Sequence, residues 1–194
     1  MKRESPSFRW GSCQSTLSQF THQHNTRRNK KMLGGLHDFA PGTMAIGRLD
    51  EHSEGLLLLT TDGKLSSAIS SSKVEKEYYA RVLGEVNDEA IERLSSGVEI
   101  SLGGGRKHLT KDCLVRRLPE DPQFSFPPRR RHQESHGPAT WVSITLREGK
   151  YRQIRKMLAG VGHPVIRLVR VRIGRLQLDD LGAGEVLEVP EFIV

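Results

Sequence analysis

The sequence predicts an α+β domain with a mixed, largely antiparallel sheet flanked by helices. Segments with the pattern of strands outnumber segments with helical spacing, and neighbouring strands are separated by short turns. Both observations favour this class over a doubly wound parallel sheet. The chain has 194 residues and a hydrophobic fraction of 36%, which suits one core. We therefore expect one globular domain, with or without a tail.

The first 35 residues differ in composition from the rest of the chain. They are polar and basic, carry the single acid Glu4, and contain no apolar core of a secretory signal. We interpret residues 1–17 as an atypical basic N-terminal segment, and a disordered basic arm is the simpler explanation of this region. The protein is then expected in the cytoplasm. If the basic start is instead a transit peptide, an organelle is expected.

The first half of the domain contains two strands and a helix. Residues 56–60 form a continuous apolar run, typical of a buried strand, which the turn pair at 62–63 stops. Residues 76–83 alternate between two faces, as a strand does. A short helix is expected next, with its N-cap at 87–88 and its end at Gly97.

The second half adds a hairpin, an insertion, two strands and a helix. Three glycines at 103–105 predict a hairpin loop, and the Pro-rich residues 119–138 form a long insertion of the kind that is functional or disordered. Residues 141–147 and 165–173 alternate as strands. A helix is expected to begin near Lys150, because apolar residues recur there at helical spacing: Tyr151, Ile154, Met157, Leu158 and Val161.

A dense group of charges precedes the buried strand. Arg48, Asp50, Glu51 and Glu54 all lie within residues 48–54. Charges beside a core are held there when they are paired or when chemistry needs them. Asp50 alone fits a cap, a structural ion pair or a nucleophile. A nucleophilic carboxylate needs a cation held beside it, and the predicted basic helix offers one.

The C-terminal third carries many cations and the single acid Glu148 between residues 147 and 175. The formal net charge of +7 and the pI near 9.7 also point toward polyanions. Arg152 and Arg155 lie off the apolar stripe of the predicted helix, so they are candidates for contact with a ligand. We favour a nucleic-acid interface, with a solvated face as the alternative. The nine cations are Arg147, Lys150, Arg152, Arg155, Lys156, Arg167, Arg170, Arg172 and Arg175.

No metal site or membrane span is predicted. The histidine pairs at 22–24 and 132–136 lie in polar, helix-poor sequence without further convincing ligands. No apolar run approaches the length of a bilayer span. We expect no metal, no membrane partner and a monomer.

Several motifs in order resemble RNA pseudouridine synthases, in the branch that acts on ribosomal uridines. Gly47-Arg48-Leu49-Asp50 with the following Ser53–Thr60 is similar to the catalytic motif of that family. Lys76-Glu77-Tyr78 is similar to its second motif and Glu148–Met157 to its third, although the third usually has Arg-Asn at 150–151. The resemblance continues downstream and covers residues 44 to 181. The Pro-Pro-Arg insertion, and the absence of the usual N-terminal S4 domain, are similar to the E-type enzymes of the large ribosomal subunit.

The resemblance implies a pseudouridine-synthase fold over residues 18–194 and a role for each site residue. Asp50 would break the N-glycosidic bond of a uridine, whose base then rotates and rejoins through carbon, without cofactor or metal. Attack on the sugar, attack on the base ring and a glycal route all stay open. Arg48 would occupy the space of the extruded base, Tyr78 would stack on the flipped uracil, and Arg155 would pair with Asp50. The implied partner is RNA, with large-subunit ribosomal RNA first.

One departure from the family concerns the N-terminus. The family normally carries an Asn-Lys-Pro strand before a Ser-Gln-Phe-Thr-like segment. That segment is present at 18–21, whereas residues 1–17 show no such strand. A missing strand favours the alternative of a catalytically silent RNA-binding or ribosome-assembly protein that uses the same basic face. The intact Asp50 favours the enzyme.

Overall fold

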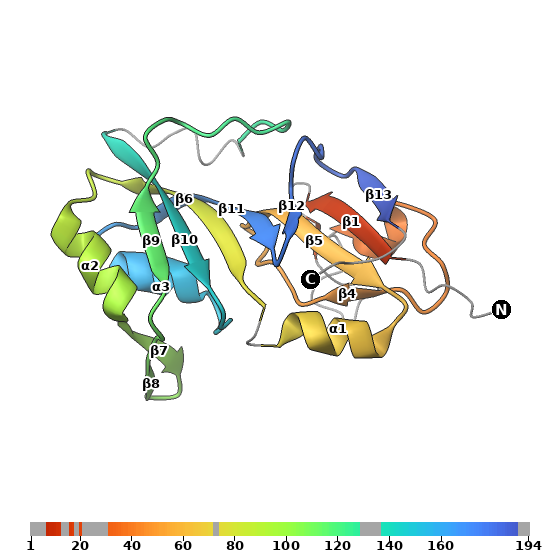
Figure 1. The fold of residues 1–194 in the computed structure, drawn as a ribbon, viewed down its shortest axis with the longest axis horizontal. Helices are drawn as coiled ribbons and strands as arrows, with labels where there is room; N and C mark the ends of the chain where they lie inside the picture. The colour runs from red at the N-terminus through yellow and green to blue at the C-terminus, as the bar shows by residue number, and fades with distance from the viewer. Residues whose placement is uncertain are drawn as a thin grey trace.

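A nine-stranded sheet runs through the molecule (Figure 1). The computed structural model describes residues 7–12, 16–17, 20, 31–71, 74–128 and 137–189. The strand order is β13-β1-β5-β11-β6-β10-β9, and β4 also pairs with β5 and β12 with β11. The strands are β1 (Ser7–Ser12), β4 (Met44–Ile46), β5 (Glu54–Thr60), β6 (Lys76–Leu83), β9 (Leu114–Arg117), β10 (Ala139–Leu146), β11 (Val165–Ile173), β12 (Leu176–Gln177) and β13 (Val186–Val189).

The predicted fold class is confirmed. Every strand pairing in this sheet is antiparallel except the one between β5 and β11. The helices are α1 (Gly63–Ser70), α2 (Asp88–Ser96), α3 (Gln153–Gly160) and the short 3-10 helix η2 (Leu33–Gly35). Two small sheets complete the described elements: β2 (Thr16–Leu17) with β3 (Lys31–Met32), and β7 (Glu99–Gly103) with β8 (Arg106–Leu109).

The parallel pairing depends on a glycine. Gly55 of β5 lies opposite Arg170 of β11, with a φ of +101°. A Cβ at this position would lie 2.3 Å from the carbonyl oxygen of Arg170, closer than any side chain tolerates. Glycine therefore brings the start of β5, and the turn that precedes it, against β11.

The N-terminal segment contributes a strand that the sequence interpretation missed. β1 lies between β13 and β5, pairs with β5 along its whole length, and buries Phe8 and Trp10. The expectation that residues 1–17 contain no strand is therefore wrong, and so is a disordered arm for these six residues. Phe8 and Trp10 alternate as a strand requires, but two apolar residues in a polar and basic segment are too short a pattern to predict one. In Figure 1 this red strand lies beside the blue β13.

The turn pair at residues 62–63 begins a helix, which was not predicted. The Asp62 carboxylate accepts hydrogen bonds from the backbone N–H groups of Lys64 and Leu65, at 2.8 and 3.2 Å, and so caps α1. Only Ile69 of this short helix is buried, which explains the weak helical pattern. The next helix follows its prediction: Asn87 caps α2 and Gly97 follows its end.

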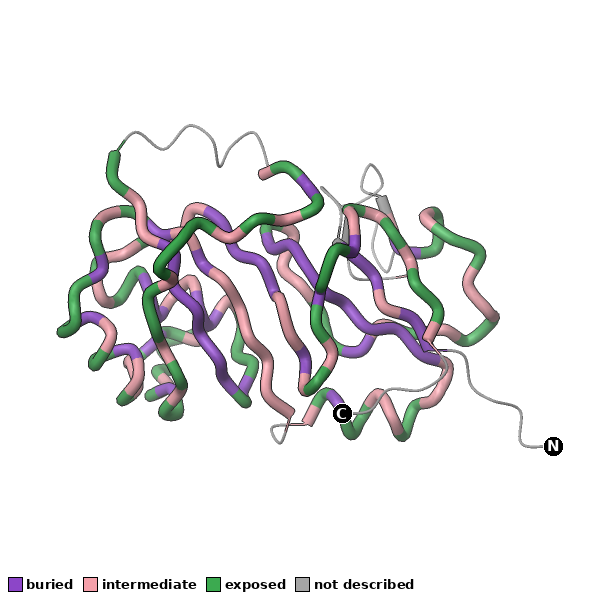
Figure 2. Tube along the Cα trace, turned by 45° about the horizontal axis from the view of Figure 1, so that its top comes forward, coloured by how far each residue is buried: buried purple, intermediate pink, exposed green. Residues whose placement is uncertain are grey.

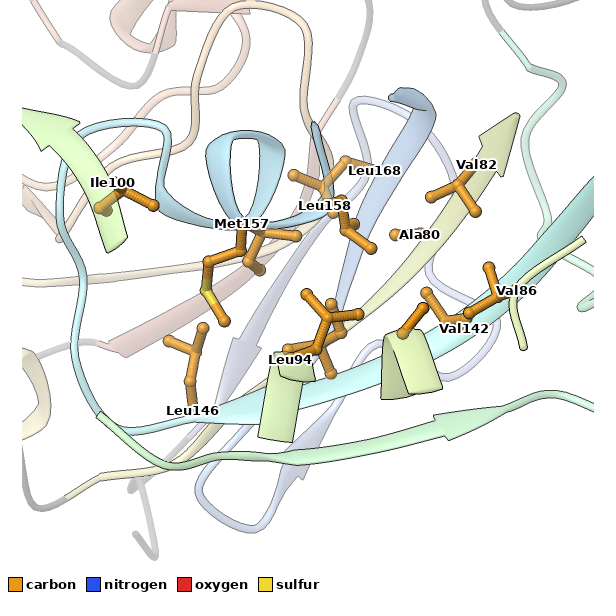
Figure 3. Packing of buried hydrophobic residues seen from close by; sticks show 13 residues of the cluster. Ala80, Val82, Val86, Leu94, Ile100, Val142, Leu146, Met157, Leu158 and Leu168 are labelled. Atoms are coloured by element: carbon orange, nitrogen blue, oxygen red, sulfur yellow. The ribbon is translucent and has the colours of Figure 1, made fainter. Parts of the chain in front are cut away.

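Helices α2 and α3 cover one face of β6 and β10 and build the largest core cluster (Figure 3). Leu94 of α2 and Met157 and Leu158 of α3 are fully buried, together with Ala80 and Val142 of the strands beneath them. Buried residues otherwise gather along the central strands of the sheet (Figure 2). This packing holds α3 in place, with its N-terminus beside the turn before β5.

The hairpin and the described part of the insertion are both ordered against the domain. The loop at 103–105 joins β7 and β8, as predicted. In the insertion, Phe124 stacks on Phe126 with ring centroids 5.6 Å apart, and Phe126 is buried. The remaining part, residues 129–136, lies outside the described residues, and so does the histidine pair at 22–24.

The described residues contain neither a cluster of metal ligands nor a helix that could span a membrane. No group of three or more metal-ligating side chains gathers among them. None of their helices is long and apolar enough to cross a membrane.

Candidate active site

One cavity collects all five residues that the sequence analysis selected for the site. Arg48, Asp50, Tyr78, Arg152 and Arg155 line a cavity of about 130 Å³. They come from the turn between β4 and β5, from β6, and from the start of α3. The rest of the lining comprises Ser53, Leu146, Glu148, Gly149, Lys150, Gln153, Ile154 and Leu168.

Asp50 lies in a tight turn and has a cation beside it. The N–H of Ser53 donates to the carbonyl oxygen of Asp50 at 2.9 Å, which closes the turn. The Oδ2 atom of Asp50 lies 3.7 Å from Nη1 of Arg152, and both side chains are about one-third exposed or less. The carboxylate is therefore partly shielded from water and paired, as the sequence analysis required of a nucleophile.

The ion pair found at Asp50 is to Arg152, whereas the prediction named Arg155. Helix α3 begins at Gln153, three residues later than predicted, and Arg152 adopts the left-handed conformation with a φ of 53°. That conformation is uncommon for a residue other than glycine, and here it turns Arg152 toward Asp50. Arg155 instead donates to the carbonyl oxygen of His52 at 2.5 Å and so contacts the same turn through its backbone.

A buried polar network holds the loop that carries Arg152. The Oε1 atom of Gln153 accepts from the N–H of Lys150 at 2.9 Å, and its Nε2 donates to Glu148 at 2.7 Å. Glu148 also accepts from the N–H of Lys111 and contacts His108 Nε2 at 3.1 Å. Burial acts to raise the pKa of Glu148, but these hydrogen bonds outweigh it and lower the pKa. The network thus ties the 148–153 loop to the β8 side of the fold.

Sequence reasoning missed the role of this network. Glu148 and Gln153 are 8% and 4% exposed, so both are structural groups inside the predicted basic face. The available signal was Glu148 itself, the single acid among nine cations. An acid in such surroundings is expected to be hydrogen-bonded when buried.

Arg48 and Tyr78 border a second cavity as well as this one. Tyr78 lies on β6, is partly buried and packs against the main core cluster, so its ring position is set by the sheet. Tyr151, predicted to face the core, is 72% exposed because the helix begins after it.

Part of the predicted nucleic-acid face points inward. Arg167 is buried and pairs with the buried Glu54 at 2.7 Å. Arg170 is 3% exposed and donates to the carbonyl oxygen of Leu56 at 2.7 Å. Arg172 pairs with Glu77 at 2.9 Å. Burial alone would lower the pKa of Arg172, but the carboxylates of Glu77 and Glu75 outweigh it and raise the pKa. The sequence pattern did not distinguish these arginines from exposed ones, because the groups that they contact are distant in sequence.

Comparison with known proteins identifies the family. Residues 13–160 match the family model described as RNA pseudouridylate synthase. A ribosomal large subunit pseudouridine synthase E from Vibrio vulnificus is 39% identical over 90% of this chain and 70% of its own length. The enzyme of the same description from Xanthomonas axonopodis is 37% identical over 85% of this chain and 84% of its own length.

Solved structures agree with the sequence matches. A crystal structure of a pseudouridylate synthase superposes with a TM-score of 0.75 at 25% identity, covering 96% of this chain and 70% of that one. A Cbf5-Nop10-Gar1 complex contains a chain with the same fold, at a TM-score of 0.54 and 17% identity over 90% of this chain and 50% of that one. By sequence, fold and site, this chain belongs to the RNA pseudouridylate synthase family and is an isomerase of the E-type branch.

Proposed function

We propose that this enzyme converts a specific uridine of large-subunit ribosomal RNA into pseudouridine, with Asp50 as the catalytic carboxylate. The relatives from Vibrio vulnificus and Xanthomonas axonopodis are both named as large-subunit enzymes, which supports this substrate class. The single observation that carries the catalytic assignment is the ion pair of Asp50 with Arg152 inside the cavity that Tyr78 also lines.

The reaction rearranges bonds within one nucleotide. The bond between N1 of uracil and C1′ of ribose breaks, the base rotates, and a bond forms between C5 and C1′, while the C5 proton is lost and N1 gains one. Atoms and electrons balance without an oxidant or a second substrate. Attack of the carboxylate on the sugar, addition to the base ring and a glycal route all require the same ionised group beside the base.

The surrounding residues have distinct roles in this proposal. Because the reacting atoms are inaccessible in a stacked strand, the uridine is flipped into the cavity, and Arg48 occupies the space it leaves. Tyr78 stacks on the uracil ring and limits its tilt as it rotates. Arg152 holds the carboxylate of Asp50 in place, and Arg155 supports the turn through the carbonyl oxygen of His52.

Incubation with unmodified large-subunit ribosomal RNA, followed by mapping of pseudouridines, tests the proposal. One position should be modified by the wild type and by no catalytic variant. Small-subunit RNA serves as the matched control. Modification of the small-subunit RNA alone would contradict the substrate class, and the absence of pseudouridine from both would contradict the proposed function.

A further inference from the structure

A second cavity adjoins the one that contains Asp50. Its volume is about 320 Å³, and it shares Arg48, Tyr78 and the 148–150 segment with the first. Its remaining lining comes from β4 and the adjoining Gly47, from α1, β6 and β11, and from Arg147 just after β10, and it includes Lys76 and Arg170. A group bound here would therefore lie directly beside a group bound at Asp50.

The lining of this cavity is strongly cationic. It contains five cations and the single acid Glu148. The carboxylate oxygens of Glu148 are already hydrogen-bonded to His108, Lys111 and Gln153, so this acid does not neutralise the cations of the cavity. Arg147 pairs with Glu75 at 3.0 Å. The ion pairs found among the described residues include none to Lys76 or Arg170.

Arg170 is a buried guanidinium whose contacts are all carbonyl oxygens. Its Nε donates to Leu56 at 2.7 Å and its Nη1 to Arg48 at 3.5 Å. Its Nη2 is buried without a hydrogen-bond partner among the described residues. A buried charge and an unused donor are both costly, and an anionic ligand in the cavity would satisfy them.

Lys76 adds a second cation, half-buried, near the first. Its Nζ donates to the carbonyl oxygen of Val74 at 3.0 Å. Burial, and in addition the charge of Arg170, lowers the pKa of Lys76. Two like charges thus face a common cavity that lacks a free carboxylate, an arrangement that destabilises the protein without a ligand.

We propose that the second cavity binds a phosphodiester group of the RNA backbone next to the flipped uridine, with Lys76 and Arg170 as its cationic contacts. This inference rests on the proposed function, because the uridine is assigned to the adjoining cavity. A phosphodiester fits the site chemically: it carries one negative charge and oxygens that accept from both a guanidinium and an ammonium. Arg48 and Tyr78 would then separate the base from the phosphate of one segment of RNA.

Lys76→Met is a more specific test than a substitution of Arg170, because Arg170 also supports the backbone of β5. Loss of the lysine relieves repulsion from Arg170, so the thermal midpoint should stay the same or rise. RNA affinity should nevertheless fall roughly tenfold, as expected for a lost charge-assisted hydrogen bond. Lys107→Met is the matched control, since Lys107 is exposed on the β7–β8 hairpin and lines neither cavity.

The first measurement is the salt dependence of RNA binding, read by fluorescence anisotropy and independent of turnover. The slope of log affinity against log salt should be shallower in Lys76→Met by about 0.7, one phosphate contact on a single strand. Lys107→Met should keep the wild-type slope. Equal slopes for wild type and Lys76→Met would overturn the proposed subsite.

The second measurement uses a synthetic RNA that contains the mapped uridine and one uncharged methylphosphonate at its 5′ or 3′ linkage. At one of the two positions, wild-type activity should fall to the level of Lys76→Met, and the variant should lose nothing further. If the ratio of Lys76→Met activity to wild-type activity is the same on the charged RNA and on both methylphosphonate RNAs, Lys76 does not contact a flanking phosphate. Failure of the wild type to modify even the charged RNA would count against the proposed function itself, while the salt slopes would still decide the subsite.

Discussion

The carboxylate of Asp50 and the guanidinium of Arg152 lie 3.7 Å apart, although they belong to opposite halves of the chain. Arg152 precedes helix α3 in the left-handed conformation, and the buried Glu148–Gln153 network holds the loop around it. The ion pair therefore depends on groups that do not touch Asp50. This relationship connects the fold to the chemistry proposed for the site.

Replacement of Asp50 by Asn should abolish pseudouridine formation and leave RNA affinity nearly unchanged. The amide keeps the shape of the side chain but removes the charge that acts on the sugar–base bond. Turnover on the mapped RNA and binding by anisotropy check the two expectations. A variant with a tenth of wild-type turnover would contradict the assignment of Asp50.

Arg152 should contribute more to turnover than Arg155. Arg152→Met removes the cation beside Asp50 and should lower kcat at least tenfold, whereas Arg152→Lys keeps the charge without the planar fork and should lose less. Arg155→Met is the matched control, because it removes a cation of the same cavity that donates to the backbone of His52. A larger loss in Arg155→Met, at equal thermal stability, would favour the pairing that the sequence alone suggested.

Tyr78→Phe should be tolerated better than Tyr78→Leu. Stacking of a base on an aromatic ring is worth about 1–3 kcal/mol, and phenylalanine keeps the ring. Leucine fills part of the volume without a flat face, so kcat/KM should fall roughly 5- to 150-fold, the factor that corresponds to that energy. If both variants lose the same activity, the hydroxyl is the working group and the stacking role is wrong.

Glu148→Gln should destabilise the protein by about 2 kcal/mol at neutral pH, because the amide cannot accept the three hydrogen bonds that the carboxylate accepts. The pKa of Glu148 is lowered in the folded state, so its stabilising effect is complete above the unfolded value and is lost as pH falls through the folded one. The difference between wild type and variant should thus be constant from pH 5 to 8 and shrink below roughly pH 4.3.

Urea unfolding across that pH range measures the difference, and Glu120→Gln in the exposed part of the insertion is a suitable control. A difference that persists undiminished at pH 3 would show that the carboxylate charge is not the source. A parallel loss of turnover at neutral pH would support the role of the network in positioning Arg152.

Much of the fold could be predicted from local patterns. The strands β5, β6, β10 and β11 are long and either continuously apolar or clearly alternating, and α2 has a cap and a terminating glycine. Periodicity of that length is a reliable signal because it reflects burial of one face. Strand β1 and helix α1 were missed, since each has only one or two buried apolar side chains to carry the pattern.

The sequence by itself selected the candidate residues of the site. Its motifs brought together Arg48, Asp50, Tyr78, Arg152 and Arg155, and the structure places all five in one cavity. Which arginine pairs with Asp50 was decided only by tertiary structure, through the left-handed turn at Arg152. Tertiary structure also decided which cations are free for a ligand, because Arg167 and Arg172 find carboxylates on strands far away in sequence, and a linear pattern carries no record of such partners.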